Sequence, residues 1–439
     1  MPKPCDKVRE ELVVRPQSTM EEFKPKPFKV FREDPRYYVV PRYWDNCSQL
    51  DGTQGPSDGP RDLRPEPASI NIHFKGRLNK DLKQDLAVQK YFETSSGGLM
   101  CLDVGFGKTV TALAIAARLG LRTMIMVHKE FLMNQWIERI QHFCPGATIG
   151  RVQQDTCELD RDFVIGMLQT LSQRPFEPKT FGSIGLLIVD EAHHIGARVF
   201  SQAMFKLCPK WTLGLTATPD RKDGLGHILN WFLGPTFIQI HRESQDQVQV
   251  KPVWFDGPFP QVTLNRLGKI SLPEMITDLC ELENRNERIV SLIHDLEETR
   301  QVLILSDRRS HCEYLAGLFG KEQAGLYMGG MSREALEKTA RDSRLIFGTF
   351  SQAHEGLDIP KLDTVILATP HSDVRQAIGR ILRETPGKIH SPLIIDIIDR
   401  WSVLVPMYYK RRATYKAKGF KQIGSEPEAE AEPELECVF

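Results

Sequence analysis

The chain has 439 residues and a mass of 50.0 kDa, a length that suits two or three domains. Hydrophobic residues make up 41% of it and charged residues 26%, and 57 basic and 57 acidic side chains leave no net charge. This balance is typical of a soluble globular protein, and no apolar stretch reaches the length of a bilayer-spanning helix, which excludes a transmembrane protein.

The cysteines and the first residues bear on the compartment. Nine cysteines are scattered along the chain without a Cys-x-x-Cys pair, which argues against a disulfide framework, a ribbon-type zinc site and a cysteine-ligated iron–sulfur cluster. The start of the chain has no apolar core of the kind a secretory signal needs. We therefore expect an intracellular, reducing location: the cytoplasm, or a nucleus or viral factory for a eukaryotic or viral source. No membrane partner is expected.

The N-terminal part of the chain is rich in proline. Eleven of the 28 prolines fall within residues 1–67. Together with two Asp-Gly turn signals, they predict an extended, loosely structured segment over residues 1–77, with a short strand around Tyr37 to Val40. We expect no part of an enzyme core there.

From residue 78 onward, short apolar runs alternate with amphipathic helical stretches, which is typical of an α/β fold with mostly parallel sheets flanked by helices. We predict one such domain over residues 78–242 and a second over 281–407. The stretch 243–280, which contains four prolines, is interpreted as a linker. The predicted strands are Gly98–Leu102, Thr123–Val127, Phe163–Met167, Gly185–Val189 and Leu213–Thr216 in the first domain, and Val302–Ser306, Leu345–Gly348, Thr364–Ala368 and Leu393–Ile397 in the second.

The C-terminal segment, residues 408–439, changes charge abruptly. Six basic residues between Tyr408 and Lys421 are followed by six glutamates between Glu426 and Glu436. Two interpretations stay open: a basic nucleic-acid contact shielded by an acidic tail, or a solvated helix end followed by a disordered terminus.

The motif Gly105-Phe106-Gly107-Lys108-Thr109 lies between a predicted strand and a predicted helix, which is the context of a phosphate-binding loop. Glycines let backbone N–H groups turn toward phosphate oxygens, and the helix N-terminus adds partial positive charge. Lys108 would meet the β- and γ-phosphates, and Thr109 would ligate Mg²⁺. A tight turn with a surface lysine is the alternative. The position five before Gly107, where the motif normally has its first glycine, holds Leu102.

Acidic and hydroxyl residues follow two further predicted strands. Asp190 and Glu191 open the sequence Asp-Glu-Ala-His, directly after an apolar run. Ligands bind at this edge of parallel sheets, so Asp190 can hold a metal through water and Glu191 can act as general base. Thr216 and Thr218 end another strand and could relay, through His193, to a second ligand, although by themselves they indicate only a turn.

The second predicted domain has a polar set of its own. Thr349 ends a strand, and Gln376, Arg380 and Arg383 follow at spacings that put all three on one face of a helix. Such a face could point at a γ-phosphate, although a solvent-exposed helix is the alternative.

In this order, the motifs resemble those of superfamily 2 helicases of the DEAH kind, closest to the XPB-like branch of ATP-dependent DNA helicases. The resemblance covers residues 78 to 400. It implies two RecA-like domains that hold ATP and Mg²⁺ between them, and it assigns roles to individual residues. Nucleotide binding falls to Gln84, Gly105, Phe106, Gly107, Lys108, Thr109, Gly356 and Asp358, metal binding to Thr109 and Asp190, and catalysis to Glu191, Gln376, Arg380 and Arg383. Coupling falls to His193, Thr216 and Thr218, and nucleic-acid contact to Lys129, Thr170 and Thr349.

Three functions follow as hypotheses. The first is a nucleic-acid-stimulated ATPase that separates DNA strands, moving 3′ to 5′ on single-stranded or forked DNA as the resemblance implies. The second keeps the ATPase but makes it a duplex translocase or an RNA-directed enzyme. The third is a catalytically silent scaffold that binds nucleic acid, or accessory proteins, through its termini. The intact Lys108, Glu191 and Arg383 argue against the third.

Overall fold

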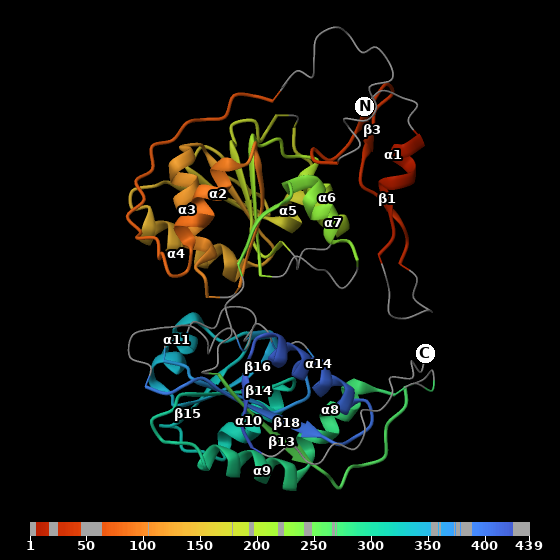
Figure 1. Cartoon of the computed structure of the whole chain (residues 1–439), viewed down its shortest axis with the longest axis vertical. Helices are drawn as coiled ribbons and strands as arrows, with labels where there is room; N and C mark the ends of the chain where they lie inside the picture. Colours follow the sequence, from red (N-terminus) through yellow and green to blue (C-terminus); the bar gives the residue numbers. More distant parts are fainter. Residues whose placement is uncertain are drawn as a thin grey trace. The chain divides into compact units, whose positions relative to one another are not determined.

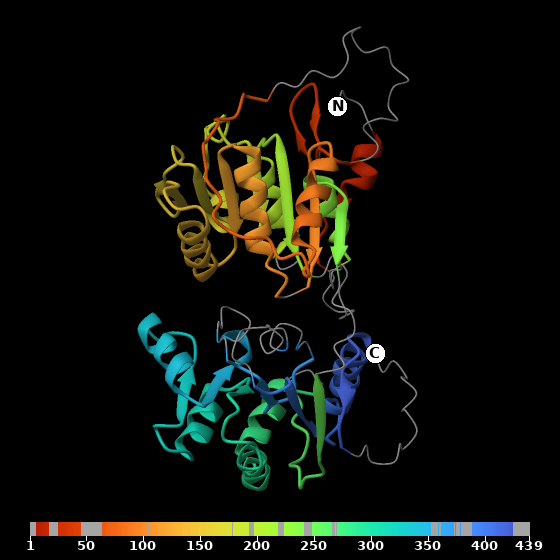
Figure 2. The same ribbon diagram turned by 60° about the vertical axis from the view of Figure 1, so that its left-hand side comes forward.

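The computed structural model describes residues 6–16, 25–44, 64–103, 105–177, 179–192, 197–217, 224–240, 248–265, 268, 270–352, 359, 361–372, 374, 378 and 389–424. The chain forms two compact units, residues 1–241 and 242–439. Figures 1 and 2 show helices on both faces of the central sheet in each unit. Among the described residues, no helix is both long enough and apolar enough to cross a membrane.

The first unit is built on an eight-stranded sheet in the order β12-β5-β11-β10-β6-β9-β7-β8. All neighbouring pairs are parallel except β7 and β8. The strands are β5 (Gly97–Leu102), β6 (Thr123–Val127), β7 (Ile149–Gln153), β8 (Thr156–Cys157), β9 (Phe163–Met167), β10 (Leu186–Val189), β11 (Trp211–Thr216) and β12 (Thr236–Ile240). Five of them match predicted strands to within two residues. β7, β8 and β12 were not predicted.

Two apolar layers cover this sheet. One face packs against α2 (Gln84–Glu93), α3 (Lys108–Leu119) and α4 (Glu130–Phe143). The other face packs against α5 (Leu168–Gln173), α6 (Ala197–Met204) and α7 (Gly226–Leu233). Alternate side chains of each strand enter opposite layers, so both faces of the sheet are buried.

Residues 6–16 and 25–44 also belong to this unit and form regular elements, whereas we expected an extended, loosely structured segment over 1–77. They form α1 (Asp6–Glu11), β1 (Val13–Val14), β2 (Phe28–Lys29), β3 (Arg32–Glu33) and β4 (Tyr38–Val39), and β4 confirms the short strand predicted there. Val8, Leu12 and Val30 are fully buried in the apolar layer of α6 and α7. The apolar residues of this proline-rich segment therefore help to cover one face of the sheet.

The second unit holds a seven-stranded, fully parallel sheet in the order β15-β16-β14-β17-β18-β13-β19. Its strands are β13 (Gln249–Phe255), β14 (Val302–Ser306), β15 (Ala324–Tyr327), β16 (Leu345–Thr349), β17 (Thr364–Leu367), β18 (Leu393–Asp399) and β19 (Lys421–Gln422). Helices α9 (Glu283–His294) and α10 (Arg309–Gly317) contribute to one apolar layer. The other layer contains residues of α11 (Arg333–Asp342) and α14 (Leu404–Ala417).

The interpretation of residues 243–280 as a linker was wrong where β13 and α8 lie. β13 pairs with β18 along its whole length, and α8 (Leu272–Glu281) packs Met275 and Leu279 against Trp401. On its other side β13 pairs with β19 only at Gln249 and Val250. The rest of β13 is thus close to a sheet edge in the described part of the chain, where a proline without an N–H is tolerated. Pro252 therefore did not exclude a strand.

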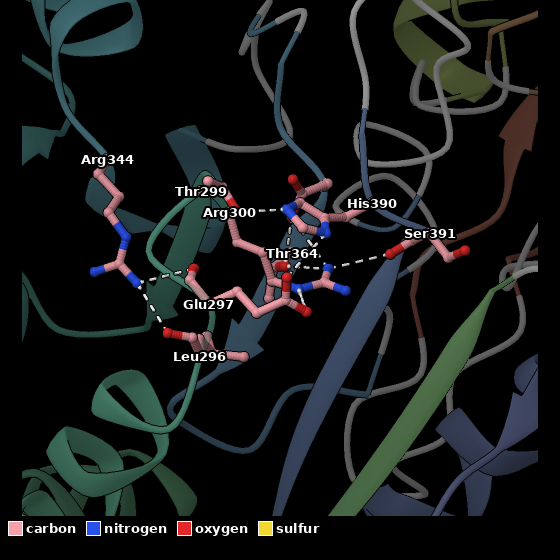
Figure 3. Close-up of polar contacts among 9 residues, drawn as sticks. Leu296, Glu297, Thr299, Arg300, Arg344, Thr364, His390 and Ser391 are labelled. Atoms are coloured by element: carbon pink, nitrogen blue, oxygen red, sulfur yellow. Dashed lines mark hydrogen bonds and ion pairs between the residues drawn. The ribbon is translucent and has the colours of Figure 1, made fainter.

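Where the strands of this sheet begin, the side chains of Arg300 and Arg344 link neighbouring segments through hydrogen bonds (Figure 3). The guanidinium of Arg300 donates to Oδ1 of Asp363 at 3.3 Å, Oγ1 of Thr364 at 3.1 Å and the carbonyl oxygen of Ser391 at 3.1 Å. Arg344, directly before β16, donates to the carbonyl oxygens of Leu296 and Glu297. This polar network joins the starts of β14, β16, β17 and β18.

The basic C-terminal stretch is in part structural. The side chain of Arg411 is 1% exposed, and its Nε and Nη2 donate to the two carboxylate oxygens of Asp396, which is 0% exposed, at 2.9 and 2.8 Å. The hydroxyl of Tyr415 donates to the same carboxylate. One of the six basic residues is thus a buried partner of a strand carboxylate, so the C-terminal stretch is not simply a basic tail. The glutamates from Glu426 onward lie outside the described residues.

Replacing Arg411 with methionine should lower the free energy of unfolding of the second unit by about 3–5 kcal/mol, because Asp396 is left buried without its cationic partner. The double variant Arg411→Met/Asp396→Leu should recover part of this loss. Urea unfolding measures both, and Arg341→Met is the matched control, since Arg341 pairs with Asp342 at the surface. A loss below about 1 kcal/mol for Arg411→Met would contradict the assignment.

Candidate active site

Several predicted site residues of the first unit gather where three neighbouring strands end. β5 pairs with β11, and β11 pairs with β10, all in parallel. Their carboxyl ends therefore lie side by side, and they lead into the glycine loop, Thr216 and Asp190 respectively. Ligands of open parallel sheets bind at such an edge. The structure thus brings together residues that the chain separates widely.

The glycine loop depends on two backbone conformations that other residues adopt only at a cost. Gly105 has φ +92° and Gly107 has φ +74°, both in the region that favours glycine. A side chain at position 107 would also collide, since a Cβ there would lie 2.4 Å from Nε2 of Gln84. Gly107 is the N-cap of α3 and supplies no side-chain cap, so the first N–H groups of this helix are available to an anion.

Gln84, expected to read the adenine base, instead contacts the loop itself in this structure. Its side chain is buried, Nε2 donates to the carbonyl oxygen of Phe106 at 2.8 Å, and Oε1 accepts from the backbone N–H of Asn79 at 2.9 Å. Both ends of the amide therefore have partners within the chain. Gln84 holds the glycine loop against the start of α2.

Lys108 and Thr109 open helix α3. Nζ of Lys108 donates to the carbonyl oxygen of Leu102 at 3.1 Å, which keeps the ammonium at the end of β5. Its positive charge also favours the charged form of Asp190 and so opposes the rise in the pKa of that carboxyl that burial causes. Thr109 is half-buried at the second position of the helix. The positive charge of this site therefore comes from Lys108, at the end of the glycine loop. The negative charge comes from Asp190, which follows β10, and β10 is separated from β5 by β11.

Asp190 is a buried carboxylate, and no arginine of the described residues hydrogen-bonds to it. It is 8% exposed, its Oδ2 accepts from the indole Nε1 of Trp136 at 2.8 Å, and its Oδ1 accepts from the backbone N–H of Glu191 at 2.9 Å. Burial, followed by the charge of Glu191, raises the pKa of Asp190 from 3.8 to about 6, against the lowering effects of Trp136 and Lys108. At neutral pH this carboxylate is charged in a place that resists charge, so a cation would stabilise it.

These residues fit Mg²⁺. The ion is commonly held by one or two protein groups, with water and substrate phosphates as its other ligands. No cluster of three or more histidine, cysteine, aspartate or glutamate side chains occurs in the described part of the chain, which argues against an all-protein metal cage there. Asp190 and Thr109 supply the kind of sparse, oxygen-only set that Mg²⁺ prefers.

Glu191 occupies a strained position. Its φ is +47°, in the left-handed region that non-glycine residues rarely adopt. Such conformations persist where surrounding contacts hold them, and they occur preferentially at functional sites. The turn places Glu191 directly after Asp190 at the strand end, with the next described helix, α6, beginning only at Ala197. Thr216, the predicted coupling residue, is fully buried at the end of β11.

Two of the predicted nucleic-acid contacts lie on neighbouring strand ends of the first unit. Lys129 is the N-cap of α4, which follows β6, and Thr170 lies in α5, which follows β9. β6 and β9 are paired, and Nε2 of Gln169 donates to the carbonyl oxygen of His128 at 3.0 Å. This bond links the segments that carry Lys129 and Thr170. Sequence patterns did not reveal it.

The third predicted contact, Thr349, belongs to the second unit. It ends β16, and its Oγ1 lies 3.1 Å from Oγ of Ser351 and accepts from the N–H of Gln352. The other predicted site residues lie outside the described residues and get no structural account: His193, Thr218, Gly356, Asp358, Gln376, Arg380 and Arg383.

Trp136 is the site residue whose role sequence reasoning missed. A signal for it existed, because a buried indole N–H usually finds an acceptor and a buried carboxylate requires donors. The sequence could not pair the two, since they lie on different elements far apart in the chain.

Two family models match the chain. The family described as "Type III restriction enzyme, res subunit" matches residues 77–221, and the family described as "Helicase conserved C-terminal domain" matches residues 284–385. The first match contains the glycine loop, Asp190 and Thr216. The second contains Thr349 and the arginine-bearing motif.

Similar proteins occur in viruses. A relative from Acanthamoeba polyphaga mimivirus, provisionally named ATP-dependent RNA helicase L396, is 31% identical over 385 residues, covering 85% of this chain and 73% of its own. A relative from Invertebrate iridescent virus 6, provisionally named helicase 161L, is 30% identical over 383 residues, covering 81% and 85%. Both relatives are similar over most of this chain.

A solved structure shows the fold. The chain is similar to S. cerevisiae Dbp5 bound to RNA and ADP BeF3, with a TM-score of 0.53 and 14% sequence identity over 77% of this chain and 88% of that one. The two units are accordingly RecA-like α/β domains, as the motifs implied.

The raised pKa of Asp190 predicts a pH-dependent effect of Asp190→Asn. The folded chain holds this proton more tightly than the unfolded chain, so wild-type stability falls as pH rises from about 4 through about 6. Asparagine carries no such charge, so the variant should be more stable than wild type by about 1–3 kcal/mol near pH 8 and by much less near pH 4. Urea unfolding at both pH values measures the difference. An equal difference at the two pH values would contradict the prediction.

Proposed function

Because this chain belongs to the superfamily 2 helicases, we propose that it is a nucleic-acid-stimulated ATPase that moves along DNA and separates its strands. The observation that carries the proposal is the grouping at one sheet edge of the glycine loop with Lys108, the carboxylates Asp190 and Glu191, and Thr216. A scaffold that only bound nucleic acid would have no use for a buried, charged carboxylate beside a phosphate-binding loop.

The proposal gives each residue of the first unit a task toward ATP. The N–H groups of the loop and of the α3 N-terminus hold the phosphates, and Lys108 leaves Leu102 to neutralise the β- and γ-phosphate oxygens. Thr109 and Asp190 would hold Mg²⁺, which when bound supplies charge neutralisation on those oxygens. Gln84 keeps the loop in shape, and its amide would exchange a chain contact for the base if it also reads adenine.

Hydrolysis then requires a base and charge stabilisation. Glu191 takes a proton from water as the water oxygen attacks the γ-phosphorus, and the bond to the β–γ bridging oxygen breaks to release ADP. We assign stabilisation of the transferred phosphoryl group to Arg380 and Arg383, with Gln376, Gly356 and Asp358 contributing to nucleotide binding or catalysis. His193, Thr216 and Thr218 would couple the nucleotide state to nucleic-acid contact.

Nucleic acid would be held mainly by its backbone. Lys129 offers charge to a phosphate, and Thr170 and Thr349 offer hydroxyl donors, which is the sequence-independent type of contact that a moving enzyme needs. A neutral chain is compatible with this mode, since few phosphates need be neutralised at once. Movement in the 3′ to 5′ direction is part of the proposal.

RNA is the second candidate partner. It is favoured by the provisional name of the mimivirus relative, which is that of an ATP-dependent RNA helicase. ATPase measurements with single-stranded DNA, duplex DNA and RNA, each with strand displacement on tailed duplexes of both polarities, decide between the candidates. Stimulation by duplex DNA without strand displacement would favour a translocase. ATP hydrolysis that no polynucleotide stimulates would overturn the proposal.

Glu191→Gln should separate binding from chemistry. Loss of the general base should lower ATP turnover by about 10²–10⁴-fold, while affinity for ATP changes by less than about tenfold. Stimulated steady-state turnover and titration with a fluorescent ATP analogue measure the two quantities. Lys108→Ala is the comparison, because removal of the phosphate-binding cation should weaken binding as well.

Arg383→Ala should behave like the loss of an arginine finger. We expect turnover to fall by about 10³–10⁵-fold, with ATP affinity retained within about tenfold. Arg341→Ala, at an exposed arginine of α11, is the matched control and should leave turnover unchanged. Equal losses of affinity and turnover in Arg383→Ala would show that this residue serves binding instead.

A further inference from the structure

Trp136 lies on the buried side of α4, facing the end of β10. It is 1% exposed and belongs to the same apolar layer as Leu132, Met133 and Ile140 of its helix. Its surroundings leave the indole ring little room to turn. The direction of its N–H is therefore set by the core of the unit, and that N–H meets Oδ2 of Asp190 at 2.8 Å.

The two oxygens of Asp190 have donors from different elements. Oδ2 accepts from α4 through Trp136, and Oδ1 accepts from the backbone N–H of Glu191 in the strand-end turn. Two donors in fixed positions determine the plane of the carboxylate. Each oxygen keeps a second lone pair, so the group can still accept hydrogen bonds from metal-bound water.

We propose that Trp136 is a positioning residue of the nucleotide site: its indole N–H holds the Asp190 carboxylate in the orientation that binds hydrated Mg²⁺. This inference rests on the proposed function, because it assigns Trp136 a part in the same site. The same hydrogen bond links α4, which begins directly after Lys129, to the Asp190 carboxylate at the end of β10.

The chemistry of the donor supports this assignment. An indole N–H donates and never accepts, so it can face only an unprotonated or acceptor oxygen of Asp190. It is also uncharged. Unlike an arginine it leaves the negative charge of Asp190 available to a cation, while fixing where that charge points.

A second buried tryptophan of the first unit also donates to a carboxylate, and it serves as the control for a purely structural role of such a bond. Nε1 of Trp44 donates to Oε2 of Glu11 at 3.0 Å, and Trp44 is 2% exposed. Trp44 packs in the apolar layer on the opposite face of the sheet from Trp136. Trp44→Phe therefore removes the same kind of bond, a buried indole to a carboxylate, without touching the site.

The test compares Trp136→Phe with Trp44→Phe in the full chain. Affinity for a fluorescent ATP analogue is titrated with Mg²⁺ and again in its absence, with folding checked by thermal unfolding. Trp136→Phe should raise the Mg²⁺ concentration needed for half-maximal tight binding by about 10–100-fold, the usual effect of removing a group that orients a metal ligand. Binding without Mg²⁺ should stay at the wild-type level, and Trp44→Phe should match wild type in both measurements.

A second variant isolates the N–H itself. Site-specific incorporation of 3-benzothienylalanine at position 136 replaces the indole N–H with sulfur and keeps the shape of the two rings. It should reproduce the Mg²⁺ defect of Trp136→Phe, and it serves in place of that variant if phenylalanine prevents folding. A wild-type Mg²⁺ requirement in this isostere would overturn the inference.

Failure of the inference and failure of the proposed function give different results. If wild type responds to Mg²⁺ and Asp190→Asn does not, while Trp136→Phe behaves like wild type, the inference alone is wrong. An Mg²⁺ defect of equal size in Trp44→Phe would also overturn it. If wild type binds no nucleotide with or without Mg²⁺, the proposed function is wrong and the inference is lost with it.

Discussion

A buried carboxylate that stays charged is the constraint around which the first unit is arranged. Asp190 lies at the end of an apolar strand, where desolvation opposes its charge, and Glu191 adds a second negative charge beside it. The charged form of Asp190 is stabilised by two neutral donors, the indole N–H of Trp136 and the backbone N–H of Glu191, and by the positive charge of Lys108. These groups do not fully offset the cost of burying the negative charge of Asp190. The remaining negative charge is why we expect the site to suit a metal-bound phosphate.

Two buried carboxylates of the second unit are instead paired with arginine. Asp396 is met by Arg411, and Asp399 is met by both Nε and Nη2 of Arg285, at 2.7 and 2.9 Å. Bidentate arginine pairs neutralise the negative charge of each carboxylate, so these groups have no unbalanced charge with which to attract a cation. The type of partner thus separates the structural carboxylates of β18 from Asp190, to which we assign a role in metal binding.

The strands that carry the site were predictable because their signals are local. Apolar runs such as Thr123–Val127 and Val302–Ser306 became β6 and β14 with the predicted bounds. Segments whose role depends on distant partners were misread. The N-terminal residues and β13 contain prolines that resemble those of a linker, yet Leu12 and Val253 are buried by contacts with other parts of their units. Proline content reports on local backbone freedom and carries no information about what covers an apolar side chain.

The sequence alone determined the family, the strand ends that hold Lys108, Asp190 and Thr216, and the chemistry these residue types can perform, because each depends on residue identity and short spacing. The tertiary structure decided which groups serve one another. It placed the Gln84 amide on the glycine loop, the Trp136 indole on Asp190 and the Arg411 guanidinium on Asp396. Such partnerships arise when elements pack across a sheet, and the distance along the chain between the partners leaves no periodic or spacing signal from which they could be read.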